Sequence, residues 1–343
     1  MKKKLFIGID FSKETIDVSF FDEEQAQKEE FHYSKFENSK DGFTTMLKWI
    51  KSLSAVNVQE WVFCGEHTGL YSIELASFLV KKKFFIWLEN PLQINRSSGI
   101  KREKTDEVDS LDIAWYAYRF RDRAKEYQLP DKSFFALQNL LAFRERLVKN
   151  KVSLQVSANE TRRVHKRDKT ASYIYEHSMR EIERLDKEIQ NAEKQMLEII
   201  EKDEKLAENY YLVKSVKGIG MINTVTILVH TQNFTTFENS RQFASFAGMA
   251  PFEDSSGTSR KRGKHIKKLG TNKEMKALLT QAARSAVVYD EELRNYYQRK
   301  LAEGKLQKVV INNVRNKLLH RIFAVVAKKQ PFQKNYMNPL SVA

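Results

Sequence analysis

The placement of glycine and proline divides this chain more sharply than any other feature of its sequence. Glycines stand at positions 8, 42, 65, 69 and 99, and residues 100–217 then contain none. The one proline in that stretch is Pro130, and a segment without these residues has little to end a helix. We therefore predict three domains: residues 1–128, a helical linker at residues 129–207, and residues 208–335.

The helical linker carries a periodic apolar pattern. Apolar residues recur at alternating spacings of three and four, which form the seam of a heptad repeat; they are Ile182, Leu185, Ile189, Ala192, Met196 and Ile199. The pattern predicts a coiled-coil hairpin or a dimerisation arm. Neither structure needs chemistry of its own, so we look for functional residues on either side of it.

The N-terminal domain is predicted to be α/β. Residues 5–9 form a short apolar run, which is typical of a strand buried on both faces. Similar patterns predict strands at 15–21, 30–33, 61–64 and 84–88, and helices at 42–53, 71–82 and from 106 onward. Three strands followed by alternating helices and strands are the element order of the ribonuclease-H-like fold. A fold alone does not give a function.

The charge of the chain points to an anionic partner. The 343 residues contain 59 Lys and Arg against 44 Asp and Glu, which gives a formal net charge of +15. Nucleic acid is the commonest partner of so basic a chain, and an anionic membrane surface is the second candidate. No apolar run approaches the roughly 18 residues that a membrane span needs. The single cysteine, Cys64, excludes an intramolecular disulfide and a cysteine-based zinc site. We expect a cytoplasmic protein.

Four carboxylates stand where the predicted elements begin or end. Asp10 ends the first strand, and Glu66 follows the strand at 61–64. Asp106 and Asp109 are three residues apart at a helix start, so both lie on one face of that helix, with Thr105 as a candidate N-cap. Strand ends and helix starts converge at one edge of an α/β sheet. The four acids are therefore predicted to bind Mg²⁺, and a pair of such ions suits phosphodiester chemistry.

The two strand-end acids also have a structural interpretation. Asp10 would cap a turn at the end of its strand, and Glu66 or Thr68 would cap the helix that follows. No His-x-x-x-His pair offers a competing zinc motif. The metal hypothesis therefore depends on the four acids meeting in space.

The C-terminal domain contains two candidate phosphate-binding segments. Gly218-Ile219-Gly220 opens a predicted helix after Lys217, and such a turn either presents backbone N–H groups to a phosphate or simply reverses the chain. A dense basic segment follows further on, which suits a loop around a phosphate backbone or a solvated loop. Its cations are Arg260, Lys261, Arg262, Lys264, Lys267 and Lys268, and Lys104 is a further candidate in the N-terminal domain.

Ser256 lies directly before this basic segment and is followed by Gly257. A serine hydroxyl is a weak nucleophile until a base or a metal activates it. No neighbouring His or Asp forms a triad with it, so the local sequence alone makes Ser256 a minor candidate. Ser255 and Ser259 stand close by.

The ordered set of these motifs resembles one family. The motifs are Gly8-Ile9-Asp10-Phe11-Ser12-Lys13-Glu14, Glu66-His67-Thr68-Gly69, Lys104-Thr105-Asp106-Glu107-Val108-Asp109, Gly218-Ile219-Gly220, Phe246-Ala247-Gly248-Met249-Ala250-Pro251 and Ser256-Gly257-Thr258-Ser259. Together they resemble the DEDD transposases of the insertion-sequence one-ten family, the bridge-RNA-guided serine recombinases. The match runs from about residue 5 to about residue 333. Lys217 stands where the family usually has proline.

The resemblance implies a fold and a set of roles. It implies a RuvC-like N-terminal domain of the ribonuclease-H class, a coiled-coil connection, and a mainly α-helical C-terminal transposase domain. The acidic tetrad would be Asp10, Glu66, Asp106 and Asp109 with Mg²⁺, and the catalytic serine would be Ser256. The implied partners are target and donor DNA, a structured non-coding guide RNA, and further copies of the chain in a homodimer or homotetramer that completes a joint site.

Two other functions fit the same residues. In a RuvC-type junction nuclease, water attacks the DNA and Ser256 only contacts the backbone. In a non-catalytic RNA- and DNA-binding scaffold, only the basic surface matters. Substitution of Ser256 and of Asp106 separates the three.

Overall fold

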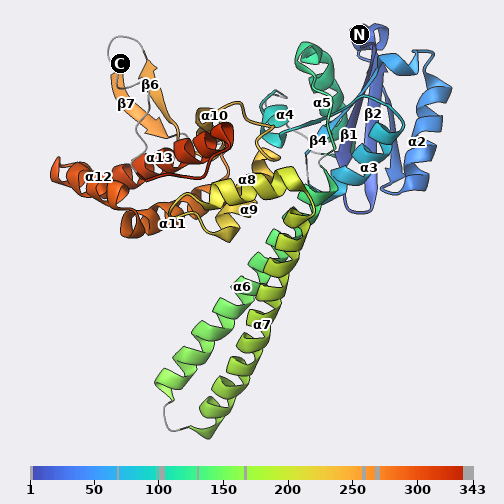
Figure 1. The fold of residues 1–343 in the computed structure, drawn as a ribbon. Helices are drawn as coiled ribbons and strands as arrows, with labels where there is room; N and C mark the ends of the chain where they lie inside the picture. Colours follow the sequence, from blue (N-terminus) through green and yellow to red (C-terminus); the bar gives the residue numbers. More distant parts are fainter. Residues whose placement is uncertain are drawn as a thin grey trace. The chain divides into compact units, whose positions relative to one another are not determined.

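The computed structural model describes residues 3–67, 69–97, 99, 105–129, 131–165, 168–256, 260–266 and 271–334. The chain divides into two compact units, residues 1–129 and residues 130–343. Figure 1 shows a sheet flanked by helices in the first unit and a largely helical second unit. In the described ranges, no helix is both long enough and apolar enough to cross a membrane.

A five-stranded mixed sheet forms the centre of the first unit. Its strands lie in the order β3-β2-β1-β4-β5. The first three pair antiparallel, whereas β4 is parallel to both β1 and β5. Their bounds are β1 Leu5–Phe11, β2 Thr15–Asp22, β3 His32–Glu37, β4 Trp61–Glu66 and β5 Ile86–Glu89. The five strands and the helices α2, α3 and α5 follow one another in the expected order, with α2 as Lys40–Leu53, α3 as Leu70–Lys81 and α5 as Asp106–Arg119.

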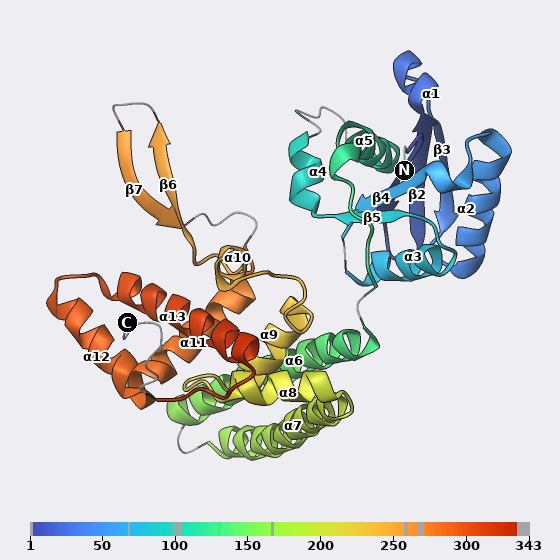
Figure 2. The same cartoon turned by 45° about the horizontal axis from the view of Figure 1, so that its top comes forward.

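Alternating side chains on each strand build two cores. On one face, Ile7 and Phe63 pack with residues of α2 (Lys40–Leu53) and α3 (Leu70–Lys81). On the other, Phe6 and Val62 pack with residues of α5 (Asp106–Arg119). In Figure 2, α5 and α2 lie on opposite sides of the sheet. Because side chains alternate along a strand, the even-numbered residues of β1 and β4 face α5, as Phe6 and Val62 do.

Some elements differ from the sequence prediction. The third strand was expected at 30–33 but runs from His32 to Glu37. The prediction was displaced because this is an edge strand whose polar sequence lacks an apolar run. The last strand begins at Ile86 rather than at residue 84. Two short helices were not expected, α1 (Glu23–Lys28) and α4 (Pro91–Ser97).

Two long helices begin the second unit. They are α6 (Lys132–Val164) and α7 (Lys169–Glu201), which Figure 1 shows side by side along their length. Ion pairs join them, from Arg144 to Glu193 at 2.6 Å and from Lys151 to Asp186 at 2.5 Å. The predicted seam faces inward, since Ile182, Ile189, Ala192 and Met196 are buried.

The remaining helices share cores with the long pair and with each other. They are α8 Glu204–Lys214, α9 Met221–Thr231, α10 Ser240–Phe246, α11 Lys273–Tyr289, α12 Glu291–Ala302 and α13 Gln307–Lys328. One cluster joins Leu137 of α6 and Met196 of α7 to Leu228 of α9. A β-hairpin, β6 (Pro251–Ser256) with β7 (Arg260–Ile266), stands out from these helices in both views (Figures 1 and 2). The expected basic loop is thus largely a hairpin.

Candidate active site

Neighbouring strands place two of the predicted acids side by side. On β1 and β4, Ile9 pairs in parallel register with Gly65, and Asp10 and Glu66 follow directly. Phe6 and Val62 point to the α5 face, so by alternation Asp10 and Glu66 point there too. Both acids are half-buried. The hydrophobic pattern of two strands therefore fixes the position of both carboxylates.

Helix α5 brings the other two acids to the same face. Thr105 caps the helix, and its Oγ1 accepts a hydrogen bond from the N–H of Val108 at 3.3 Å. The helix packs directly on β1 at Gly8, where a Cβ atom would lie 2.1 Å from the carbonyl oxygen of Ser110. A buried hydrogen bond of 2.7 Å between Ser19 and Ser110 holds the same contact. Only glycine permits this approach, which sets the first turn of α5 beside the end of β1.

The four predicted acids line one cavity of about 400 Å³: Asp10, Glu66, Asp106 and Asp109. Helix α4 adds Ile94 and Asn95 to its wall. Burial raises the pKa of Asp10, and the nearby carboxylates of Asp109 and Asp106 raise it further. Like charges therefore gather in this cavity, and such clustering is typical of sites that take a cation or transfer protons.

The cavity offers hard oxygen donors, which suit Mg²⁺. In the part of the chain that the structure describes, however, no group of three or more His, Cys, Asp or Glu residues is arranged so that it could hold a metal ion. The acids fit a divalent cation by chemistry and by their shared cavity. Their side chains would have to turn toward a common centre to bind it.

Three residues beside this cavity were not predicted from the sequence. Asp17 of β2 pairs with Asp10 across the antiparallel strands, and it is 2% exposed. Tyr33 donates a hydrogen bond to Asp17 at 2.6 Å, which raises the pKa of Tyr33 to about 12. Lys35 lies 3.3 Å from Asp17 and 3.2 Å from Asp106. Alternation along Thr15–Asp22 would have placed Asp17 on the polar side of its strand.

The predicted nucleophile lies in the other unit. Ser256 is the last residue of β6, and its backbone pairs with Arg260 at the end of the hairpin next to the turn. The turn residues 257–259, which include Ser259, lie outside the described residues. Ser255 pairs with Lys261. The serine is therefore carried at a hairpin tip that follows directly on the Gly248-Met249-Ala250 motif.

A buried polar network anchors the base of this hairpin. Asn312 of α13 donates a hydrogen bond to the carbonyl of Met249 at 3.1 Å, and Arg315 donates to the Asn312 side chain at 2.8 Å and to Thr280 at 3.0 Å. Arg315 is 7% exposed, and burial lowers its pKa. Gly248, with a φ of +65°, packs against Thr271 at the other side of the hairpin. The segment before the serine is thus held from two sides.

Two blocks of the chain match known protein families. Residues 7–161 match a family model described as a transposase, the DEDD type of IS110, and residues 210–298 match one described as the transposase IS116/IS110/IS902 family. The first block contains all four cavity acids, and the second contains the serine hairpin.

The relatives point the same way. Two pilin gene-inverting proteins, from Moraxella bovis and Moraxella lacunata, are each 26% identical over 334 residues, which is 96% of this chain and 98% of theirs. A 43.6 kDa protein of insertion element IS110 from Streptomyces coelicolor is 30% identical over 115 residues, or 34% of this chain and 28% of its own.

The chain belongs to the IS110 family of transposases. A transposase acts on DNA, so the chain is a DNA-cutting enzyme and DNA is its partner. The family assignment confirms the resemblance seen in the motifs.

The cationic residues that were predicted to contact nucleic acid in the IS110 transposase fall into three groups. Lys104, Lys267 and Lys268 lie outside the described residues. Four more cations belong to β7, namely Arg260, Lys261, Arg262 and Lys264. Lys217 is exposed and shares a cavity of about 150 Å³ with both acids and bases, including Asp290, Glu291 and Arg294.

The two glycines of the Gly218-Ile219-Gly220 turn differ. Gly218, with a φ of +90°, packs against α11, where a Cβ would lie 2.7 Å from that of Ala286. Gly220 is the exposed N-cap of α9, and a Cβ there would meet no atom of the described residues within 4 Å. Gly220 is therefore open to a ligand, whereas Gly218 serves packing.

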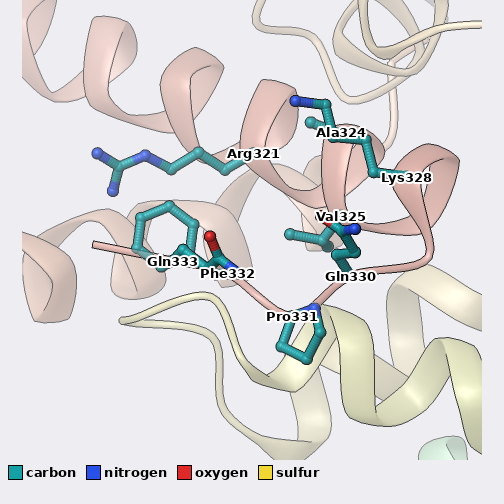
Figure 3. Close-up of a pocket in the computed structure, with 8 residues that line it drawn as sticks. All are labelled: Arg321, Ala324, Val325, Lys328, Gln330, Pro331, Phe332 and Gln333. Carbon is teal, nitrogen blue, oxygen red and sulfur yellow. The ribbon is translucent and has the colours of Figure 1, made fainter. Parts of the chain in front are cut away.

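A further cavity of about 170 Å³ lies between α13 and the segment after it (Figure 3). The guanidinium of Arg321 lies 4.7 Å from the centre of the Phe332 ring, and the N–H of Phe332 donates to Ser215 at 2.8 Å. These contacts fix the end of the described chain against α13 and α8. Within the described ranges, no sequence-predicted site residue of the transposase lines this cavity.

Proposed function

We propose that this IS110 transposase is an RNA-guided DNA recombinase that cuts and rejoins strands through Ser256 and an Mg²⁺-binding tetrad. The tetrad is Asp10, Glu66, Asp106 and Asp109. The observation that supports it most is the shared cavity, because residues distant in the sequence converge there as a phosphoryl-transfer site requires. The sheet order and the helix on its acidic face support a RuvC-like assignment of this unit.

The chain's residues divide the reaction between them. The Ser256 oxygen attacks a DNA phosphorus atom, a serine–phosphate bond forms, and the bond to one DNA oxygen breaks; that oxygen takes up the proton that serine gives up. A hydroxyl of another strand then attacks the phosphoserine phosphorus, so that a new DNA phosphodiester forms, the bond to Ser256 breaks, and the serine oxygen takes up the proton of that hydroxyl. Mg²⁺ held by the tetrad would stabilise negative charge on the phosphate oxygens. The tetrad carboxylates hold and orient, and Ser256 carries the covalent bond.

The serine and the acids belong to different units of the chain, residues 130–343 and 1–129. We propose that they meet in a joint site of a homodimer or homotetramer in the cytoplasm, with a structured non-coding RNA that pairs with target and donor DNA. The three domains expected from sequence, 1–128, 129–207 and 208–335, belong to this proposal. The Moraxella relatives support recombination, since their names describe inversion of a gene, which requires strands to be cut and rejoined.

Ser256→Ala tests the nucleophile. End-labelled DNA carrying the junctions that flank this gene is incubated with the full chain, Mg²⁺ and the RNA transcribed from the adjoining non-coding DNA. The wild type should form a covalent protein–DNA adduct that survives denaturation and disappears on protease treatment. Ser256→Ala should lose the adduct by about 10³-fold or more, because no other group takes its place. Ser255→Ala, one residue away, is the matched control and should keep the adduct.

Asp106→Asn tests the tetrad in the same assay and should abolish both adduct and strand transfer. In a hydrolytic junction nuclease, the cavity acids, which all belong to one unit, would act on water. Such an enzyme would not need the serine of the other unit. If Ser256→Ala still cut DNA as fast as the wild type, water would be the nucleophile and the serine mechanism would be wrong. If neither substitution changed DNA processing, the metal site would be wrong as well.

A further inference from the structure

The charged residues beside the tetrad form one row across the sheet. On the α5 face, Glu66 of β4, Asp10 of β1, Asp17 of β2 and Lys35 of β3 follow one another, because Asp10 pairs with Asp17 and Asp17 pairs with Lys35. Three acids therefore lie next to one another, and the row ends in a cation. Its position at the edge strand lets the Lys35 side chain reach the start of α5.

Lys35 contacts one acid of the cavity and one acid beside it. Its ammonium lies 3.2 Å from Asp106 Oδ2 and 3.3 Å from Asp17 Oδ1. The two partners differ, since the Asp17 side chain is 3% exposed whereas that of Asp106 is 64% exposed. Asp17 is also fixed by the hydroxyl of Tyr33. The contact with Asp17 is thus built into the sheet, and the contact with Asp106 is open to solvent.

This difference has a consequence for any cation that enters the cavity. A metal ion needs the Asp106 carboxylate, one oxygen of which is held by an ammonium group. The ammonium can give up Asp106 without losing its charge partner, because Asp17 remains within reach. Because the ammonium of Lys35 stays paired with the buried Asp17, its release of Asp106 costs little free energy.

We propose that Lys35 is the internal cation of the tetrad: it holds Asp106 when no metal is bound, and stays on Asp17 when a divalent ion takes Asp106. Lys35 is a positioning residue in this role, and Asp17 is its anchor. The inference rests on the proposed function, because it requires that the tetrad bind metal. It adds that a protein side chain sets the metal affinity by competing for one ligand.

The test is metal binding to the full-length, chelator-stripped protein, with Mn²⁺ alone as the probe and free Mn²⁺ followed by electron paramagnetic resonance. Lys35→Met should bind Mn²⁺ about three- to fivefold more tightly than the wild type, because a competing charge near a ligand oxygen is gone. Lys35→Arg keeps the charge and should stay within about twofold of the wild type. Lys48→Met, an exposed lysine of α2, removes the same charge from the same unit and should also stay within about twofold.

Unchanged or weaker Mn²⁺ binding by Lys35→Met overturns the inference. If Lys35→Met does not fold, Lys35→Gln replaces it, and Asp17→Asn should have the opposite effect, since the ammonium then keeps only Asp106. Tighter binding by Asp17→Asn contradicts the anchor role. Asp109→Asn separates the two proposals. If the wild type and Asp109→Asn bind Mn²⁺ equally, the tetrad does not bind metal, so the proposed function is wrong and this inference with it. A loss in Asp109→Asn with no effect of Lys35→Met overturns the inference alone.

Discussion

The two regions that carry the proposed chemistry are built differently. The acids of residues 1–129 stand on paired strands and a capped helix, and packing on both faces of the sheet fixes them. The serine stands at the end of a two-stranded hairpin whose described support lies at its base. A rigid frame suits groups that must hold a fixed geometry. A hairpin suits a group that has to be delivered to a partner.

The contrast extends to how each region handles charge. The acidic region gathers carboxylates and balances part of their charge with Lys35. The hairpin base instead buries a guanidinium, Arg315, that donates to neutral oxygens of Asn312 and Thr280. A buried charge with neutral acceptors is costly, and here it holds the Asn312 side chain that binds the Met249 carbonyl.

The largest expected effect breaks the rigid region. Gly8→Ala places a methyl group 2.1 Å from the carbonyl oxygen of Ser110 and 2.3 Å from the backbone nitrogen of Ala114. Backbone atoms cannot move aside cheaply, so α5 must shift, at a cost of about 3 kcal/mol or more. Hydrogen exchange should accelerate in β1 and α5 and stay unchanged in α11 and α13, and strand transfer should be lost.

Gly220→Ala is the control for this substitution, because its methyl group would meet no atom of the described chain within 4 Å. It should cost less than about 1 kcal/mol, the value of an N-cap change. Equal stability of Gly8→Ala and the wild type would show that α5 does not depend on close contact with β1.

A smaller effect is expected at the hairpin base. Asn312→Leu keeps the volume but leaves the Met249 carbonyl and one Arg315 donor without a partner, which should cost about 1–3 kcal/mol. Denaturant unfolding measures the loss, and hydrogen exchange at Met249 and Ala250 should accelerate. Asn316→Leu is the matched control, because Asn316 donates to a carbonyl of its own helix. If both variants behave alike, the network does not hold the hairpin.

The same contrast explains what the sequence could predict. The convergence of Asp10 and Glu66 follows from the apolar runs before them, because a buried strand announces itself by composition. Lys35 could not be found this way, since β3 is a polar edge strand and the sequence suggested a strand that ended before it. The hairpin was expected as a loop for a similar reason: its strands are polar and charged, so no apolar alternation marks their pairing. Elements that pack through apolar side chains can be predicted from the sequence, whereas elements held by pairing of polar strands cannot.

The smallest expected effect is the pH dependence of stability that Asp10 causes. The pKa of Asp10 is raised by burial and then by Asp109 and Asp106, so the folded chain holds the Asp10 proton more tightly than the unfolded chain does. Ionised Asp10 therefore costs stability at pH values above that raised pKa, and the cost disappears below the ordinary value of 3.8.

Asp10→Asn is neutral at every pH and removes this cost. In the presence of a chelator it should stabilise the chain at pH 7.5 by about 0.5–1 kcal/mol once solvent screening is allowed for, and the gain should shrink as the pH falls toward 4. Urea unfolding across a pH series measures it, with Asp122→Asn, an exposed acid of the same unit, as the control. With excess Mg²⁺ the order should reverse, because the wild type then gains the binding energy of the ion. If Asp10→Asn is less stable than the wild type at pH 7.5 without metal, the cavity acids do not repel one another, and the contrast in charge between the acidic region and the hairpin base is wrong.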